Sequence, residues 1–155
     1  MKTPFAKKEG HIPKYFLINA EGKTLGRLAT EISKLLRGKE LNYFSPGTFQ
    51  GNYVIVFNAK KIIVSGKKEE QKLYYRTTQR PGNLKLETLG QLRIKRSARI
   101  LEKAVYGMLP KGVLGRKYYK RLFVYGIGDL FYKKAQKSYG KILSRPIISY
   151  QDNIK

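Results

Sequence analysis

Hydrophobic residues recur with the 3.6-residue period of an amphipathic helix in two stretches of this chain. The first covers residues 25–36, with charged side chains on the opposite face, and the second covers residues 100–109. Residues that commonly cap or stop a helix flank both stretches, namely Thr24, Gly38, Ser97 and Pro110. The pattern therefore predicts two helices, each with one buried face.

Short apolar runs predict β-strands between the helices and beyond them. They lie at residues 14–20, 52–58 and 120–126, with possible further strands at 62–65 and 72–76. The first strand, the first helix and the strand at 52–58 form a βαβ unit, which implies a right-handed crossover and a parallel strand pair. These runs are apolar on both strand faces, as in a sheet covered by helices. The residues thus predict one α/β domain.

Two local motifs add detail to this prediction. The segment Gln79-Arg80-Pro81-Gly82-Asn83 has the residue chemistry of a turn, and Thr88-Leu-Gly-Gln91 matches a capping box that opens a short helix. No internal repeat or compositional break marks a second domain. We expect a basic N-terminal arm at residues 1–13, one domain at 14–132 and a basic C-terminal extension at 133–155.

Lysine and arginine outnumber the acidic residues 33 to 10, which gives the 155-residue chain a formal net charge of +23. A net charge this far from zero opposes the compact state unless a polyanion neutralises it, and nucleic acid is the foremost candidate. The chain is nevertheless 41% hydrophobic, with 12 tyrosines and 7 phenylalanines, so its composition excludes a disordered basic tail. We therefore expect a folded domain with a polyanionic partner.

Other protein classes are disfavoured by what the sequence lacks. Without cysteine, neither a disulfide framework nor a thiolate metal site is possible, and the single histidine, His11, cannot form a metal site alone. No apolar run approaches the roughly 18 residues that a membrane span requires. The N-terminus lacks the hydrophobic segment of a secretory signal. We expect a soluble intracellular protein with no metal, no cofactor and no membrane partner.

The segment Gly22-Lys23-Thr24 lies between the first strand and the first helix, where a phosphate-binding loop would place the same three residues. The Walker pattern needs a glycine five residues before Gly22, and that position is Leu17, inside the strand. A tight turn is therefore the favoured interpretation, and a nucleotide-dependent enzyme is a minor alternative. The 10 acidic residues are scattered, so no carboxylate pair is apparent for acid–base catalysis.

Basic residues are interleaved with aromatic residues in three segments, at 72–76, 116–121 and 131–134. Lysine and arginine can contact phosphates, and tyrosine can stack on exposed bases or hydrogen-bond to 2′-hydroxyl groups. Because alternate residues of a strand face opposite ways, only one of Tyr74 and Tyr75 should point outward. The interleaving predicts a nucleic-acid-binding surface.

The stretch at 104–117 is the most concentrated part of this surface. The apolar face of the second helix runs there into a basic loop whose glycines would let the backbone approach an anion. The basic side chains of the loop are Lys111, Arg116 and Lys117. From residue 88 to residue 128 the only acid is Glu102, against ten lysines and arginines. An ordinary solvated face would mix the two signs.

The chain resembles the bacterial-type large-subunit ribosomal protein L-thirteen family, in family order over roughly residues 14–137. The motifs that carry the resemblance are LGRLAT at 25–30, LRGK at 36–39, GNYVIV at 51–56, NAK at 58–60, SGKK at 65–68, KLYYR at 72–76, RPG at 80–82, AVYGMLPK at 104–111, LGRK at 114–117 and LFVY at 122–125. No single motif would suffice, but the ordered set is specific.

The resemblance implies a three-layer α/β/α protein with a small, mainly parallel sheet that binds large-subunit ribosomal RNA early in assembly and is not an enzyme. It also implies that the segments at 65–68, 74–82 and 107–117 face RNA. The main candidate RNA-binding residues are Arg76, Arg80, Lys111, Arg116 and Lys117, with Lys39, Lys67, Lys68, Tyr75, Lys120 and Arg121 in support.

Neighbouring large-subunit ribosomal proteins are the other implied partners, with no small-molecule substrate and no homo-oligomer. A charge-driven, non-specific nucleic-acid-binding protein is one alternative function, and an enzyme using Gly22-Lys23-Thr24 is the other.

Two segments depart from the family pattern. Thr77-Thr-Gln79 stands where the family usually has His-Ser-Gly, and Leu130-Phe-Tyr-Lys133 stands where His-Pro-His is expected. The RNA contacts that the resemblance would otherwise imply at 77–79 and 129–133 are therefore not assigned to this chain. The lost motifs and the residue usage, rich in Lys, Tyr, Ile and Asn, are similar to those of cyanobacterial and plastid members. We expect a ribosome in the plastid stroma, with the mitochondrial matrix or the bacterial cytoplasm as alternatives.

Overall fold

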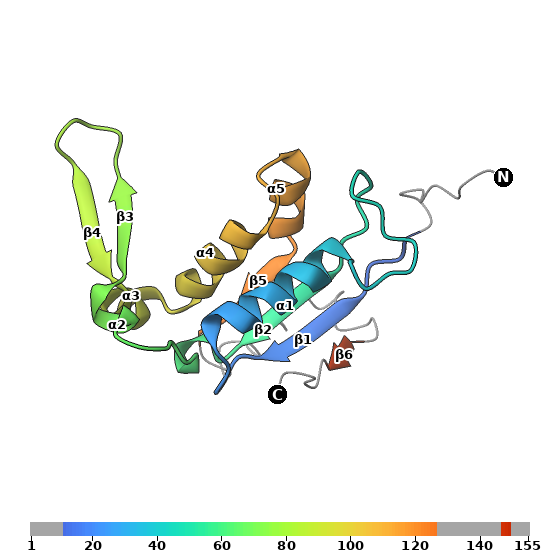
Figure 1. Ribbon diagram of the computed structural model, residues 1–155, viewed down its shortest axis with the longest axis horizontal. Helices are drawn as coiled ribbons and strands as arrows, with labels where there is room; N and C mark the ends of the chain where they lie inside the picture. Colours follow the sequence, from blue (N-terminus) through green and yellow to red (C-terminus); the bar gives the residue numbers. More distant parts are fainter. Residues whose placement is uncertain (1–10, 127–146, 150–155) are drawn as a thin grey trace, which may run out of the picture.

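A four-stranded parallel sheet forms the centre of the computed structural model, which describes residues 11–126 and 147–149 (Figure 1). Its strands are β1 (Tyr15–Asn19), β2 (Tyr53–Phe57), β5 (Leu122–Val124) and β6 (Ile147–Ser149). They lie in the order β5–β2–β1–β6, and Ile55 of β2 stands opposite Leu17 on one side and Phe123 on the other. The predicted single α/β domain with a small, mainly parallel sheet is confirmed.

Helix α1 (Leu25–Arg37) connects β1 to β2 as the predicted crossover. It ends at Gly38, whose φ of 73° lies in the left-handed region that favours glycine. A side chain at this position would also meet the carbonyl oxygen of Gln50 at 2.5 Å. The predicted N-cap position of Thr24 is confirmed, although its side chain makes no capping hydrogen bond.

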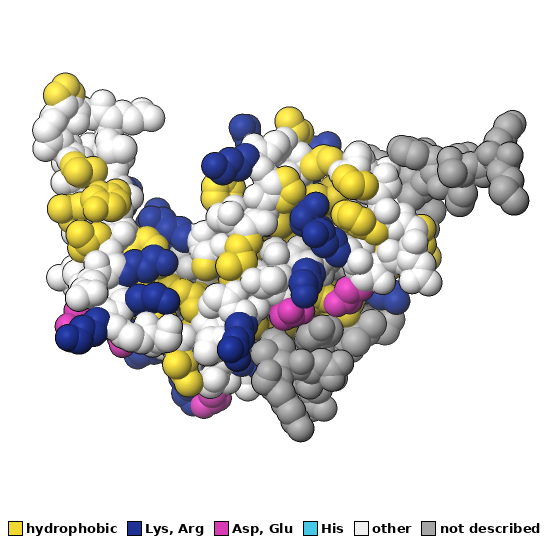
Figure 2. Space-filling model, viewed as in Figure 1, with side chains coloured by type: hydrophobic (Ala, Val, Ile, Leu, Met, Phe, Trp, Pro, Cys, Tyr) yellow, Lys and Arg dark blue, Asp and Glu magenta, His cyan; other side chains and the backbone are white. Residues whose placement is uncertain are grey.

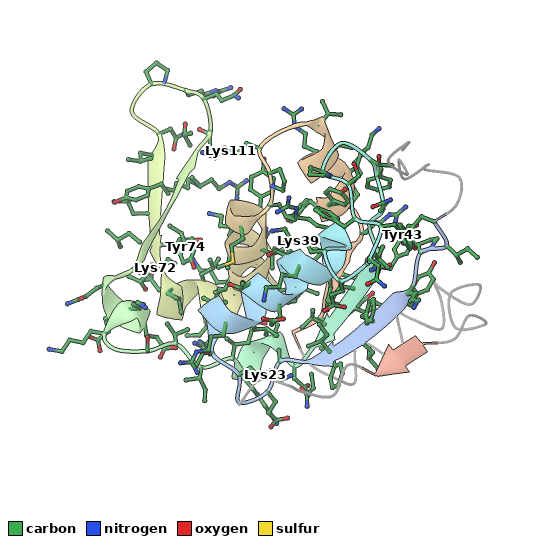
Figure 3. All side chains as sticks on the ribbon, turned by 45° about the vertical axis from the view of Figure 1, so that its right-hand side comes forward. Lys23, Lys39, Tyr43, Lys72, Tyr74 and Lys111 are labelled. Carbon is green, nitrogen blue, oxygen red and sulfur yellow. The ribbon has the colours of Figure 1, made fainter. Side chains whose placement is uncertain are left out.

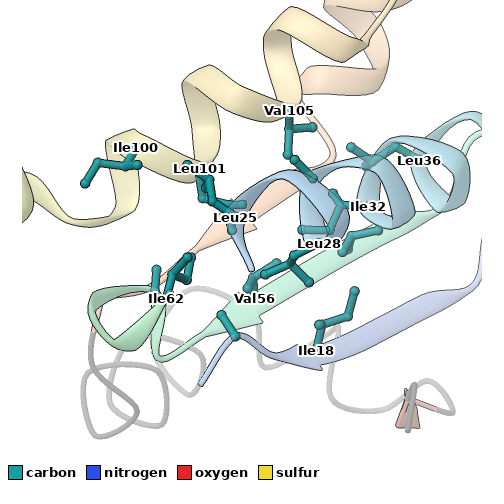
Figure 4. Packing of buried hydrophobic residues seen from close by; sticks show 14 of the residues in the cluster. Ile18, Leu25, Leu28, Ile32, Leu36, Val56, Ile62, Ile100, Leu101 and Val105 are labelled. Atoms are coloured by element: carbon teal, nitrogen blue, oxygen red, sulfur yellow. The ribbon is translucent and has the colours of Figure 1, made fainter. Parts of the chain in front are cut away.

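Each face of the sheet has its own set of apolar side chains, and Figure 4 shows the set that packs against the helices. Val54 and Val56 point toward the helices and belong to the main core. Ile55, between them, packs on the opposite face with Leu17 and Phe123. The buried hydrophobic residues of the described helices all belong to the main core, and the largest fully buried ones are Leu28, Ile32, Leu35, Leu36, Leu89, Leu101 and Val105.

An antiparallel hairpin projects from the body of the domain (Figure 1). It consists of β3 (Leu73–Thr77) and β4 (Leu84–Thr88). The predicted turn at its tip is confirmed, with left-handed backbone at Gln79 (φ 64°) and Gly82 (φ 73°). Strand β4 was missed from the sequence, although Leu84 and Leu86 alternate with charged residues in the pattern of a strand.

Two short helical turns flank the segment at 62–65, where a strand was possible. They are η2 (Ala59–Lys61) and α2 (Lys68–Gln71). Ile63 makes only an isolated parallel bridge with Thr24, in which Leu25 N donates to Ile63 O at 3.0 Å. The prediction of a third strand here is wrong, because a single bridge is too short to continue the sheet.

The remaining helices run from the base of the hairpin across the sheet. They are α3 (Leu89–Arg96), α4 (Ala98–Met108) and α5 (Val113–Tyr119). The predicted capping box of α3 is confirmed, since Gln91 N donates to Thr88 Oγ1 at 3.3 Å and Thr88 N donates to Gln91 Oε1 at 3.1 Å. Ser97 has helical backbone angles and makes no capping hydrogen bond, so its predicted role is wrong.

Most of the predicted basic loop before Lys117 is helical, which corrects the sequence-based expectation. Helix α5 contains Arg116 and Lys117, and only residues 109–112 separate it from α4. Gly115 packs directly on Pro110, because a Cβ atom at Gly115 would overlap the carbonyl of Pro110. This glycine therefore allows the protein's own segments to approach one another.

The predicted C-terminal extension contributes β6, which pairs in parallel with β1. The other residues of the extension, the departure at 129–133 and residues 1–10 lie outside the described part of the chain. None of the described helices is long and apolar enough to cross a membrane.

Candidate nucleic-acid interface

A hollow of about 620 Å³ lies between the N-terminus of α1, helix α2 and one side of α4. We call it the hairpin recess, since it borders the base of β3. Its basic side chains are Lys68, Lys72 and Lys103, and its apolar side chains include Leu25, Ile63, Val64, Ala104 and Met108. Figure 2 shows lysine and arginine side chains beside apolar ones between the hairpin and the helices. No acidic residue lines it.

Tyr74 of β3 contacts two lysines that line the recess, Lys72 and Lys103, and Figure 3 shows it beside Lys72. Its ring packs against the main core, and Lys72 Nζ and Lys103 Nζ lie 5.5 and 4.9 Å from the ring centroid. Burial raises the pKa of the Tyr74 hydroxyl, which therefore stays neutral under the two lysines. Tyr75 points the other way and is 61% exposed, so the prediction that one of the two tyrosines faces outward is confirmed.

A second hollow, of about 440 Å³, adjoins the recess. Its lining residues are Thr30, Ser33, Lys34, Arg37, Lys39 and Met108. Because Met108 lines both hollows, they form one continuous basic path along α1 and α4. The predicted candidate Lys39 lies on this path, just beyond the end of α1 (Figure 3).

Most of the other candidates lie in three places, and all of their side chains are exposed. Lys67 and Lys68 stand at the start of α2, and Arg80 is in the turn of the hairpin. The α5 cluster surrounds α5 and consists of Lys111, Arg116, Lys117 and Lys120. Arg76 is exposed on the face of the hairpin opposite to Tyr75 and lines a different hollow, with α3 and the first turn of α4.

Arg121 differs from the other candidates because its guanidinium group is engaged within the protein. It lies 4.2 Å from the ring centroid of Phe49 and 4.6 Å from that of Tyr53, and it donates to Gly51 O. Burial lowers the pKa of Arg121. These contacts connect β5 with the loop before β2, which is a structural role.

The turn at Gly22-Lys23-Thr24 has no free row of backbone amides for a phosphate group. Gly22 N donates to Lys61 O at 3.3 Å, and Lys23 N donates to Ala20 O at 3.3 Å. The amide of Leu25 donates to Ile63 O at 3.0 Å. A phosphate-binding loop needs such groups unpaired and convergent, so the geometry favours the tight turn predicted from the sequence.

His11 lies against the loop before β2, where its Nε2 donates to Gly51 O at 3.3 Å. Burial is the largest effect that lowers the pKa of His11, and Arg121 and Lys14 lower it further. Within the described residues, no three His, Cys, Asp or Glu side chains are grouped as metal ligands.

Several cations of the interface were missed from the sequence, among them Lys34, Arg37 and Lys103, whereas Lys72 lies in the predicted segment at 72–76. Helical spacing places Lys103 and Gly107 on one side of α4, and this was the available signal. The position of that side opposite β3 depends on the tertiary fold.

Comparison with known proteins agrees with these observations. The family model described as ribosomal protein L13 matches residues 13–127. The large ribosomal subunit protein uL13 of Picosynechococcus sp. is 48% identical over 125 residues, covering 81% of this chain and 83% of that protein. The proteins of the same name from Stenotrophomonas maltophilia and Agathobacter rectalis are 49% and 50% identical, covering 81% and 83% of this chain and 88% and 91% of their own lengths. The chain therefore belongs to the ribosomal protein L13 family.

Proposed function

We propose that this protein is a structural constituent of the large ribosomal subunit and that it binds large-subunit ribosomal RNA. The observation that carries this function is the continuous path formed by the hairpin recess and the hollow beside it. Six cations line the path, namely Lys34, Arg37, Lys39, Lys68, Lys72 and Lys103. No acid lines either hollow. Of these six cations, only Lys34 forms an ion pair within the described part of the chain, with Glu31 at 3.2 Å.

The proposed mechanism is electrostatic capture followed by fit to a folded RNA surface. The path and the α5 cluster would neutralise on the order of 8 phosphates, which corresponds to a log–log salt slope of about −6 to −7. Specificity would come from RNA shape and from unstacked bases. Tyr75 is free to stack on such a base, whereas Tyr74 holds the hairpin in place.

We assign the RNA contacts to Lys39, Lys67, Lys68, Tyr75, Arg76, Arg80, Lys111, Arg116, Lys117 and Lys120. For Arg121 we propose a structural role, because its charge is covered by Phe49 and Tyr53. The unit that binds RNA would be the domain at 14–132, flanked by the arm at 1–13 and the extension at 133–155. Neighbouring large-subunit proteins would be the other partners, with no homo-oligomer.

We propose no enzymatic activity for this chain. The paired amides at Gly22 and Lys23 support this view. Binding of ATP or GTP that is abolished by Lys23→Ala would contradict it.

For the compartment, we propose the plastid stroma, on the basis of the residue usage and the two departures from the family pattern. The relatives compared above are bacterial proteins, and their identities of 48 to 50% do not separate a plastid from a bacterial ribosome. Localisation of the tagged full-length chain in cells of its source organism tests the plastid directly.

Sedimentation of native lysate in a sucrose gradient tests the function. We expect the chain to migrate with the large ribosomal subunit at moderate salt and to remain there after a high-salt wash. Migration as a free small protein would contradict the proposal. Equal affinity for heparin, duplex DNA and a large-subunit RNA transcript would instead favour a binder that relies on charge alone.

A further inference from the structure

A third hollow, of about 710 Å³, lies on the side of α4 that faces away from the hairpin recess. Arg99 and Glu102 of α4 line this hollow, whereas Lys103 and Gly107 line the recess. We call it the α3–α4 hollow. Its basic side chains come from η2, β3, α3 and α4, and they are Lys60, Arg76, Arg93, Lys95, Arg96 and Arg99.

Two of these cations serve the fold. Arg93 is only 19% exposed, and its Nη1 donates to Lys60 O at 3.0 Å and to Ile62 O at 2.7 Å. Its Nε lies 2.7 Å from Glu69 Oε1, in an ion pair that connects α3 to α2. Lys95 forms an ion pair with Glu87 of β4 at 3.1 Å. These contacts fix the walls of the hollow before any ligand binds.

Four cations are left without an ion pair in the part of the chain that the structure describes, namely Lys60, Arg76, Arg96 and Arg99. Arg76 and Arg99 nevertheless lie near Glu87, because their charges help Lys95 to lower the pKa of that carboxyl. The hollow thus brings together charges from four elements that are separate in the sequence. Glu102 is the single acid of its lining.

From this charge distribution we propose that the α3–α4 hollow binds backbone phosphates of a second RNA segment, so that α4 lies between two RNA contacts. The inference rests on the proposed function and extends it to a surface that the candidate residues, apart from Arg76, did not include. Three of the four unpaired cations are arginines, whose planar guanidinium groups bind phosphate oxygens in a bidentate way. The volume of about 710 Å³ also suits a stretch of backbone better than a single small anion.

The single acid also fits an RNA ligand. The carboxylate of Glu102 can accept a hydrogen bond, whereas the lysine and arginine side chains around it can only donate. The 2′-hydroxyl group of RNA supplies a hydrogen-bond donor that DNA lacks. A wholly basic hollow would not make this distinction. An acidic ribosomal protein is the competing occupant, and the test separates it from RNA.

The first experiment measures the affinity of the full-length chain for an in vitro transcript of bacterial large-subunit ribosomal RNA at several salt concentrations. For Arg96→Ala/Arg99→Ala we expect about tenfold weaker binding and a salt slope smaller in magnitude by about 1.4 to 1.8, as for two lost phosphate contacts. The matched control is Lys14→Ala/Arg27→Ala, which removes two exposed charges that line none of the three hollows. Similar binding by the two variants would overturn the inference.

The second experiment locates the two RNA segments and uses the absence of native cysteine. An iron–EDTA group is attached to Ala98→Cys in the α3–α4 hollow or to Gln71→Cys in the hairpin recess, and RNA cleavage by hydroxyl radicals is mapped. We expect two sets of cleaved nucleotides that do not overlap. Cleavage from Gln71→Cys alone would overturn the inference and leave the hollow to a protein neighbour, while the proposed function would stand. Overlapping sets would exclude a second segment, and failure of the unmodified chain to bind the transcript would remove the proposed function itself.

Discussion

Lys103 of α4 lies over the ring of Tyr74 in β3, with its Nζ 4.9 Å from the ring centroid. The contact connects a projecting hairpin to a helix that is itself part of the main core. Lys72, at the end of α2, approaches the same ring, with its Nζ at 5.5 Å. The ring therefore sets the angle of the hairpin and holds two cations at the edge of the recess.

Replacing Tyr74 should weaken both the hairpin and RNA binding. We expect Tyr74→Ala to cost about 2 kcal/mol of the free energy of unfolding, because a half-buried aromatic ring is lost. Urea unfolding and hydrogen exchange of the β3 amides measure the effect. Tyr74→Phe keeps the ring and should behave like the original chain, so an equal loss in both variants would show that the hydroxyl is what matters.

Gly115→Ala should destabilise the protein, although alanine is the better helix former. The new Cβ would overlap the carbonyl of Pro110, so α5 must move away from the end of α4. We expect a cost of about 2 kcal/mol or more in chemical unfolding. Gly107→Ala is the matched control, since nothing lies within 4 Å of a Cβ at that helical position, and it should stabilise by about 0.5–1 kcal/mol. Equal effects at the two sites would contradict the packing role of Gly115.

Substitutions around α5 should affect stability and RNA binding separately. Replacing Arg121 should lower stability, whereas replacing Arg116 and Lys117 should weaken RNA binding. Arg121→Ala removes a guanidinium group held between two rings and its hydrogen bond to Gly51, and we expect a loss of about 2 kcal/mol in thermal unfolding. Arg116→Ala/Lys117→Ala removes exposed charges and should weaken RNA binding on the order of tenfold with little change in melting temperature. Unchanged RNA affinity in the double variant would remove α5 from the interface.

Glu102→Gln should stabilise the protein near neutral pH. Burial raises the pKa of the Glu102 carboxyl in the folded state, so the ionised form opposes folding above that raised pKa. The carboxyl is only partly buried, so solvent screening limits the gain to about 0.5 kcal/mol, or a melting temperature about 1–3 °C higher. The difference from the original chain should shrink as the pH falls through the raised pKa toward the ordinary value of 4.5. The same substitution at the exposed Glu40 should give no gain, and a gain that persists at low pH would rule out this cause.

Elements with strong local signals were predictable from the sequence. The helices around Ile32 and Leu101, three of the four strands of the sheet and the capping box at Thr88 follow from periodicity and short-range hydrogen bonding. Helix α5 was not predictable in this way. Its buried residue Tyr118 donates a hydrogen bond to Thr48 O, 70 residues away in the chain.

The candidate site was only partly predictable for the same reason. Counting charges identified the basic segments, and alternation along β3 predicted that one of Tyr74 and Tyr75 faces outward, which the structure shows to be Tyr75. Charge counting does not distinguish Arg116, which is exposed, from Arg121, which two rings cover. The α3–α4 hollow depends on four elements meeting in space, so no single window of sequence contains it.

The parallel pairing of β2 with β5 also determines the order in which the domain can be completed during synthesis. Val56 of β2 can pair with Val124 of β5 only after the residues between them have been translated. These residues form the hairpin and the helices η2, α2, α3, α4 and α5. At about 5–20 residues per second, this interval lasts several seconds. During that time the outer edge of β2 is an unpaired strand edge, open to association with other nascent chains. The edge of β1 that pairs with β6 stays open still longer, because Ile147–Ser149 is translated last of the described strands.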